Sequence, residues 1–119
     1  MDKFRPEAFL PVTPVAFEIL LALADGERHG YSILQEVERR SGGAVSLHAG
    51  TLYRALARLL ENELIEELSE APDPSNDDER RRYYRLTPRG IGVARAEVAR
   101  LEGQLAAARA RRLLKGARA

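Results

Sequence analysis

The chain of 119 residues contains no cysteine and no tryptophan. Without cysteine there is no disulfide, no thiolate ligand for a metal and no cysteine nucleophile. Histidine is almost as scarce, because His29 and His48 are the only two and they are not spaced as a pair of ligands on one helix. We therefore expect no metal site and no cofactor, and a fold that depends on its hydrophobic core.

Long apolar runs are also missing. No stretch approaches the roughly eighteen apolar residues of a membrane span, and residues 1–10 lack the continuous apolar segment of a secretion signal. A chain with 45% hydrophobic and 31% charged residues has the composition of an ordinary folded domain. We predict one soluble, cytoplasmic domain with no membrane contact. Dimerisation with a second copy of the chain is a candidate way to complete its hydrophobic core.

The sequence has little of what catalysis needs. It contains no phosphate-binding glycine loop, and its carboxylates fall on the expected outer faces of helices or in one polar loop. A nucleophile or an acid/base pair has to converge in a concave site, which this distribution does not favour. We predict that the protein is not an enzyme.

Charge is segregated along the chain, although the net charge is only +1. Every charged residue from Glu61 through Glu79 is acidic, and the arginines Arg80, Arg81, Arg82, Arg85 and Arg89 follow at once. Clustered arginine suits the phosphate backbone of a nucleic acid, and an ordinary solvated surface is the alternative interpretation.

Two helices are predicted in the first third of the chain. Thr13 and Pro14 are a favourable start for a helix that runs to about Ala24 and is mostly buried. A second helix is expected over 29–40, with Tyr31 on its apolar face and Glu36 on its polar face.

A third helix is expected over 49–62. Its leucines recur at helical spacing and point inward: Leu52, Leu56, Leu59 and Leu60. Four other residues are left on the opposite side: Thr51, Arg54, Ala55 and Arg58. A small hydroxyl beside cations suits contact with a DNA groove, so this face is the candidate reading surface, and an ordinary helix surface is the alternative.

Two short strands are predicted after this helix, over 64–68 and 82–86. The segment APDPSNDDER between them is rich in turn formers and has the composition of a hairpin tip. A helix followed by strand, charged loop and strand is typical of a winged helix, in which the helix enters the major groove and the wing follows the backbone. The predicted fold class is therefore mainly α with a two-stranded antiparallel wing (α+β).

A long last helix is expected from Thr87-Pro88 to about Leu114. Apolar residues recur along it at spacings of three and four: Ile91, Ala94, Val98, Leu101, Leu105 and Ala108. This seam predicts a homodimer, and packing against the first helix is the alternative. We divide the chain into a winged-helix part, 1–87, with an arm at 1–12 and a wing at about 69–81, and a C-terminal dimerisation helix and tail, 88–119.

Four motifs stand in the order and spacing of one known family. They are HGYSILQEV at 29–37, GTLYRALARL at 50–59, LIEEL at 64–68 and YYRLTPRG at 83–90. Together they resemble the PadR-type transcriptional regulators, specifically the short group with a single C-terminal helix. The resemblance implies a winged helix-turn-helix that dimerises through its last helix and represses genes, often its own, until a small molecule or cellular signal releases it.

The resemblance also implies roles for individual residues. The helix that holds Gly50, Thr51, Leu52 and Tyr53 would be the recognition helix, and Tyr31 would lie near the DNA backbone. Arg54 stands where many members have proline. The missing tryptophan means that the aromatic sandwich of drug-binding members is not assigned here.

Some roles stay open between two interpretations. Tyr53 either donates a hydrogen bond to a phosphate or packs in the core, and His48 either caps the third helix or contacts the backbone. The complete set of predicted DNA contacts is Tyr31, His48, Thr51, Tyr53, Arg54, Arg58, Arg80, Arg81 and Arg82.

The sequence thus predicts a sequence-specific, ligand-responsive repressor that binds a pseudo-palindromic operator as a homodimer. The alternative is a winged-helix adaptor that binds a protein. The expected wall of a small-molecule cavity contains Phe9, Phe17, Ile91 and Val98, although packing in the dimer core is the favoured interpretation of these residues.

Overall fold

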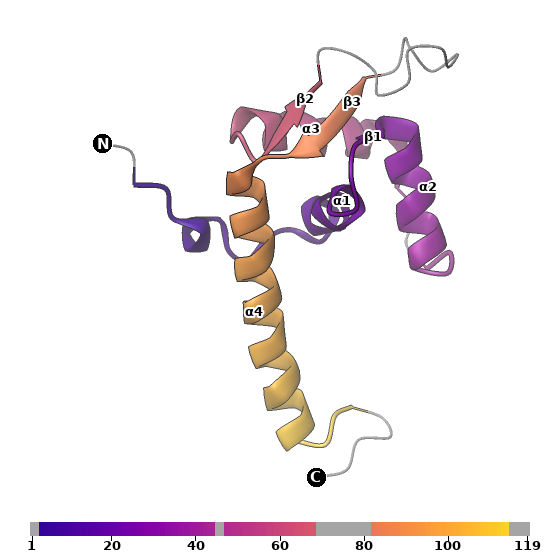
Figure 1. Ribbon diagram of the computed structural model, residues 1–119. Helices are drawn as coiled ribbons and strands as arrows, with labels where there is room; N and C mark the ends of the chain where they lie inside the picture. The colour runs from indigo at the N-terminus through magenta and orange to yellow at the C-terminus, as the bar shows by residue number, and fades with distance from the viewer. Residues whose placement is uncertain (1–2, 45–46, 69–81, 115–119) are drawn as a thin grey trace.

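The structure is a computed structural model that describes residues 3–44, 47–68 and 82–114 (Figure 1). The predicted wing tip at about 69–81, with Arg80 and Arg81, lies outside the described residues. The order of elements along the described chain is as follows: η1 (Pro6–Phe9), α1 (Pro14–Leu23), β1 (Arg28–His29), α2 (Gly30–Arg40), α3 (Ala49–Glu61), β2 (Ile65–Glu67), β3 (Tyr83–Leu86) and α4 (Pro88–Ala110).

The helices begin where local capping groups are available. The Ala16 N–H donates to Thr13 Oγ1 at the start of α1, and the Gly90 N–H donates to Thr87 Oγ1 at the start of α4, at 3.2 and 3.0 Å. Both caps agree with the prediction from Thr-Pro. Helix α2 has a different cap, because the Ser32 N–H donates to the Nδ1 atom of His29 at 3.1 Å.

The sheet has one strand more than predicted. Its order is β1-β3-β2 and every pairing is antiparallel, with Arg28 opposite Tyr84 and Ile65 opposite Leu86. The predicted second helix began at His29, but His29 ends β1 and caps α2. A strand of two residues is too short to show the alternation by which strands are recognised, so only its long-range pairing with β3 defines it.

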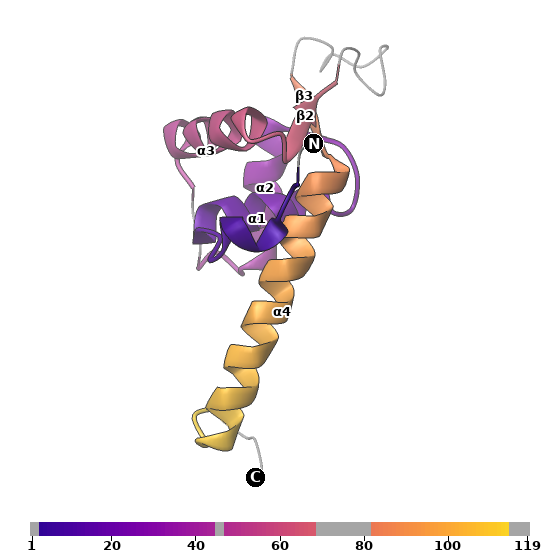
Figure 2. The ribbon, with the colours of Figure 1, turned by 90° about the vertical axis from the view of Figure 1, so that its left-hand side faces the viewer.

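The core surrounds α1, which packs against α2, α3, β3 and α4 (Figures 1 and 2). Its buried hydrophobic residues are Ile19, Leu20, Ala22, Leu23, Ile33, Val37, Leu52, Leu56, Leu59, Leu64, Ile65, Tyr84 and Val93. The predicted leucine stripe of α3 is confirmed for three of its four members, and Leu60 is half-buried.

The faces of α2 differ from the prediction. Tyr31 was placed on the apolar face but is 54% exposed, and Glu36 was placed on the polar face but is buried. The Glu36 carboxylate is compensated by Arg39, which donates to it, and by Arg28, whose guanidinium lies 3.7 Å away. Burial of a carboxylate requires such partners, and helical periodicity does not reveal them.

Helix α4 has 23 residues and extends about 35 Å. It ends at Ala110, four residues before the predicted end, where Arg112 adopts a left-handed φ of 60°. Its first turns pack against η1, α1 and β3. Its C-terminal half projects away from the other described elements in both views (Figures 1 and 2).

A buried carboxylate joins α4 to the segment before α1. Glu97 is 2% exposed, and its Oε1 accepts from the Val12 N–H at 3.3 Å. Arg100 donates to both carboxylate oxygens of Glu97, at 2.8 and 2.6 Å. The hydrogen bond from Arg100, with that of the Val12 amide, holds the pKa of Glu97 below its ordinary value. This contact fixes the N-terminal segment beside α4.

Candidate nucleic-acid interface

Helix α3 buries one side and presents the other to solvent. Leu52, Leu56 and Leu59 are buried, and the side turned outward consists of Gly50, Tyr53, Arg54, Ala57, Arg58 and Glu61. Thr51 and Ala55 are half-buried at one edge of this outer side. The structure therefore separates the predicted reading face into two exposed arginines and a less accessible threonine.

The two arginines of α3 are not neutralised by carboxylates within the described part of the chain. Neither Arg54 nor Arg58 forms an ion pair with another described residue, and Arg54 makes only a long hydrogen bond of 3.5 Å to Thr51 Oγ1. Unpaired guanidinium groups on an exposed helix can donate to phosphates or to guanine edges without first breaking a salt bridge.

The arginines of the hairpin differ from those of α3. Arg85 Nε donates to Glu66 Oε1 across β3 and β2 at 2.5 Å, and Arg82 lies 3.8 Å from Glu67. The side chain of Arg82, the only wing arginine predicted to bind DNA that the structure describes, is 73% exposed. Its charge is available to a phosphate but is partly offset by the adjacent carboxylate.

Tyr53 connects α3 to the start of α2. It is 50% exposed, and its hydroxyl lies so close to Gly30 that a Cβ atom added there would be 2.6 Å from the oxygen. Tyr31, beside Gly30, is also exposed. The ring of Tyr53 thus lies over the N-terminus of α2, not within the leucine core. The two tyrosines, the start of α2 and the outer side of α3 form one candidate surface.

The two histidines have different positions. His48 is exposed and occupies the N-cap position of α3, but its side chain makes no capping hydrogen bond. His29 caps α2 and its ring meets that of Tyr83 edge-on, with 5.3 Å between ring centroids. His29 therefore joins β3 to α2.

A charged cluster that the sequence did not predict holds α2 in place. The hydrogen bond from Arg39 and the charges of Arg28 and Arg40 hold the pKa of Glu36 below its ordinary value. Arg40 also donates to the Glu18 carboxylate of α1, and Arg28 Nε donates to the Ala22 carbonyl at 2.8 Å. The cluster fixes α2, whose first turn carries Tyr31, against α1. The pairs of Glu36 with Arg39 and Arg40 have helical spacing. The contacts of Arg28 with α2 and of Arg40 with α1 join separate elements, and no spacing in the sequence indicates these.

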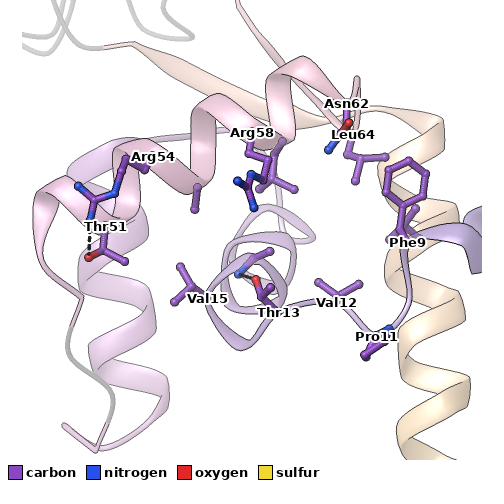
Figure 3. A pocket seen from close by; sticks show the side chains of 14 residues that line it. Phe9, Pro11, Val12, Thr13, Val15, Thr51, Arg54, Arg58, Asn62 and Leu64 are labelled. Carbon is purple, nitrogen blue, oxygen red and sulfur yellow. Dashed lines mark hydrogen bonds between the residues drawn. The ribbon is translucent and has the colours of Figure 1, made fainter.

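A cavity of about 400 Å³ lies between the N-terminal segment, the start of α1 and α3 (Figure 3). Phe9, from the predicted effector region, lines it, whereas Ile91 and Val98 line a second hollow of about 660 Å³ beside α4. Phe17 lines neither hollow. The predicted cavity wall is therefore divided between two separate places.

The described part of the chain holds neither a cluster of metal ligands nor a helix that could span a membrane. Within 3–44, 47–68 and 82–114, no three histidine, aspartate or glutamate side chains gather as metal ligands. No helix in these same ranges has the length and apolar composition needed to cross a membrane.

The chain resembles known transcriptional regulators in sequence and fold. Residues 19–96 match the profile of the transcriptional regulator PadR-like family. The structure of a transcriptional regulator from Clostridium thermocellum is 28% identical and superposes with a TM-score of 0.67, covering 78% of this chain and 84% of that one. A PadR family transcription regulator from Clostridium difficile, at 23% identity, shares the fold with a TM-score of 0.69 over 81% of this chain and 95% of that one.

A curated relative is much longer than this chain. An uncharacterized 37.1 kDa protein in a transposon of Streptomyces fradiae is 40% identical over 90 residues, which are 73% of this chain. The match spans only 24% of that protein. Most of the relative is therefore unmatched by this chain.

Proposed function

The chain belongs to the PadR-like family of transcriptional regulators, and from that premise we propose that it is a sequence-specific repressor that binds its operator as a homodimer. A winged helix-turn-helix places its recognition helix in the major groove. Helix α3 has this position in the fold, so it is the element that we assign to base reading.

The observation that carries the proposal is the outer side of α3. Arg54 and Arg58 are exposed there and form no ion pair with a described residue. A guanidinium group bound to O6 and N7 of guanine is the commonest specific contact in DNA recognition. We assign Arg54 and Arg58 to base or phosphate contacts, with Thr51 at the edge of the same side.

The remaining predicted contacts surround this helix. We propose that the hydroxyls of Tyr53 and Tyr31 donate to phosphates, and that His48, at the start of α3, contacts the backbone. Arg82, with Arg80 and Arg81 of the wing, would supply charge along the adjacent backbone. In this proposal residues 1–87 contact DNA and 88–119 form the dimer.

The exposed seam of α4 supports the homodimer. Val98, Leu101 and Leu105 are 42%, 36% and 41% exposed, and the last two lie on the half of the helix that projects from the domain. An apolar stripe at spacings of three and four on an isolated helix is stable when a second helix covers it. The proposed seam consists of Ile91, Ala94, Val98, Leu101, Leu105 and Ala108. A twofold dimer would place two α3 helices in successive major grooves, about 10 base pairs apart.

A protein-binding adaptor is the competing function. Such a surface is expected to present exposed apolar or aromatic anchors. Helix α3 presents Tyr53 but also two arginines that form no ion pair with a described residue, which favours DNA. We propose no catalytic role and no cofactor. Action on the chromosome agrees with the cytoplasmic address expected from the sequence.

Selection from a random-sequence duplex library separates the two functions. We expect enrichment of a pseudo-palindrome with half-sites about 10 base pairs apart, and two protomers bound to each duplex. The R54Q/R58Q variant should enrich no motif, whereas R109Q, which removes an exposed charge from α4, should enrich the same motif as the wild type. Failure of the wild type to enrich any motif would favour the adaptor.

A further inference from the structure

The arginines that follow the acidic part of the sequence are paired with glutamates from that part. The pairs are Arg85 with Glu66 at 2.5 Å, Arg82 with Glu67 at 3.8 Å and Arg89 with Glu63 at 3.7 Å. In contrast, Arg54 and Arg58 of α3 form no ion pair with a described residue. The arginines of α3 and those of the hairpin therefore differ in whether a carboxylate offsets their charge.

Arg85 and Glu66 form the closest of these pairs. They lie directly opposite each other in the antiparallel register of β3 and β2, and Arg85 Nε donates to Glu66 Oε1. Their side chains are 50% and 46% exposed. An ion pair this exposed contributes little to stability. Its main effect is on the charge that this part of the surface presents to a charged partner.

The pair lies on the face of the sheet that is turned away from α3. Tyr84, the neighbour of Arg85, is buried in one core with Leu52 and Leu56 of α3. Successive side chains of a strand point to opposite faces, so Arg85 points away from that core. It lines the hollow beside α4, to which α3 contributes no residue. A duplex read by the outer side of α3 would thus lie on a different side of the domain from Arg85.

We propose that Glu66 is a specificity-determining residue, because it neutralises a cation that would otherwise hold DNA on a side of the domain that reads no bases. Contacts of cations with phosphates carry no sequence information and supply most of non-specific binding. With Arg85 paired, a larger share of the affinity for DNA comes from α3. The proposal rests on the proposed function, since it assumes that α3 reads DNA.

Loss of the Glu66 charge should affect two kinds of DNA differently. DNA of any sequence can bind to the released Arg85, whereas the complex made through α3 does not involve this side chain. Each added phosphate contact steepens the dependence of the binding constant on salt by about 0.9 logarithmic unit. The ratio of the affinities for a selected and a scrambled duplex, which measures specificity, should therefore fall.

Fluorescence anisotropy of the full chain with a selected duplex, and with a scrambled duplex of the same length, tests this over a series of salt concentrations. E66Q releases Arg85 and should bind the scrambled duplex about threefold more tightly, with a salt slope steeper by about one unit. E66R adds a second cation and should bind it about tenfold more tightly, with a slope steeper by about two units. Both variants should bind the selected duplex as the wild type does.

Two variants separate the ion pair from the total charge. The charge swap E66R/R85E reverses the pair in the same register and should restore the wild-type affinity for the scrambled duplex. E38Q removes an exposed carboxylate of α2 that forms no ion pair with a described residue, so it changes the net charge as E66Q does but releases no arginine. It should bind both duplexes as the wild type does. Circular dichroism and sedimentation equilibrium verify that each variant has the fold and the oligomeric state of the wild type.

An equal gain of E66R for both duplexes would mean that Arg85 contacts DNA in the specific complex, and that Glu66 sets affinity and not specificity. A gain of E38Q as large as that of E66Q, no gain in E66Q and E66R, or a charge swap that binds like E66R would also overturn the assignment. If the wild type selects no duplex, the proposed function fails. The comparison of E66R with E66R/R85E on the scrambled duplex then still decides whether Glu66 offsets the charge of Arg85.

Discussion

The hydroxyl of Tyr53 lies against Gly30, where a methyl group would be only 2.6 Å from the oxygen. This contact joins the exposed side of α3 to the first turn of α2. The contact links the motif at 29–37 to the motif at 50–59, because the absence of a side chain at Gly30 leaves room for the hydroxyl of Tyr53.

A substitution at Gly30 should therefore act through Tyr53. G30A is expected to displace the tyrosine side chain, which is flexible at its end, and to change the free energy of unfolding by no more than about 1 kcal/mol. Y53F should weaken DNA binding about fivefold through loss of one hydrogen bond. Anisotropy of a labelled duplex should show that G30A/Y53F binds about as weakly as the weaker single variant. Fully additive losses would mean that the two positions act independently.

Gly90 is a stronger constraint, because an added Cβ would lie 1.9 Å from the carbonyl oxygen of Leu64. Backbone cannot yield as a side chain can, so G90A should destabilise the fold by about 3 kcal/mol or more. At Gly103, on the same helix, a Cβ would meet no atom within 4 Å. G103A should stabilise the chain by up to about 1 kcal/mol. Urea unfolding compares the two variants, and a G90A protein as stable as the wild type would contradict the packing of α4 against the backbone at Leu64, just before β2.

Glu97 should make stability depend on acid pH. Its pKa in the folded chain is lowered from an ordinary value of 4.5, chiefly by Arg100, so folding favours the ionised form. That stabilisation is complete above the unfolded pKa and is lost as the pH falls through the lower folded pKa. E97Q should be less stable than the wild type at about pH 7, and the difference should narrow below about pH 4.5.

Urea unfolding at several pH values measures this difference. E102Q removes an exposed carboxylate from the same helix and is the matched control, which should follow the wild type. If the free energy of unfolding of E97Q differed from that of the wild type by the same amount at every pH, the loss of stability would come from the changed shape of the side chain and not from its charge.

The seam of α4 predicts the oligomeric state. L101E/L105E introduces charges into the proposed dimer contact and should give a folded monomer in sedimentation equilibrium. Its affinity for a two-half-site duplex should fall at least tenfold. A106E/A107E adds the same charges on an exposed part of the helix away from the seam and should remain dimeric. A wild type that sediments as a monomer would exclude this dimer.

Local signals in the sequence predicted most of the fold. Thr13 and Thr87 mark helix starts because a cap is formed within one turn, and the leucines of α3 mark its buried side because periodicity follows the helix. The exposure of Arg54 and Arg58 followed from the same periodicity.

Features that depend on distant partners were not predicted. Strand β1 is defined only by its pairing with β3, and the buried carboxylates of Glu36 and Glu97 have partners in other elements, Arg28 and the Val12 amide. Tyr31 has an aromatic ring but lies outside the core, since Ile33 and Val37 fill that position. The predicted effector residues line two separate hollows and not one cavity. The N-terminal segment forms one wall of the first hollow, and no local pattern in the sequence predicts the path of that segment.

The most direct test of the central claim is a fluorescence-anisotropy titration of the chain against a duplex from the region upstream of its own gene. The titration is made at two salt concentrations, with a scrambled duplex as competitor, and repeated with R58Q. We expect selective binding of two protomers per duplex that weakens with salt, and for R58Q a reduced affinity with a salt slope shallower by about one unit. Equal affinity for the operator and the scrambled duplex, with R58Q indistinguishable from the wild type, would contradict the claim that α3 reads DNA.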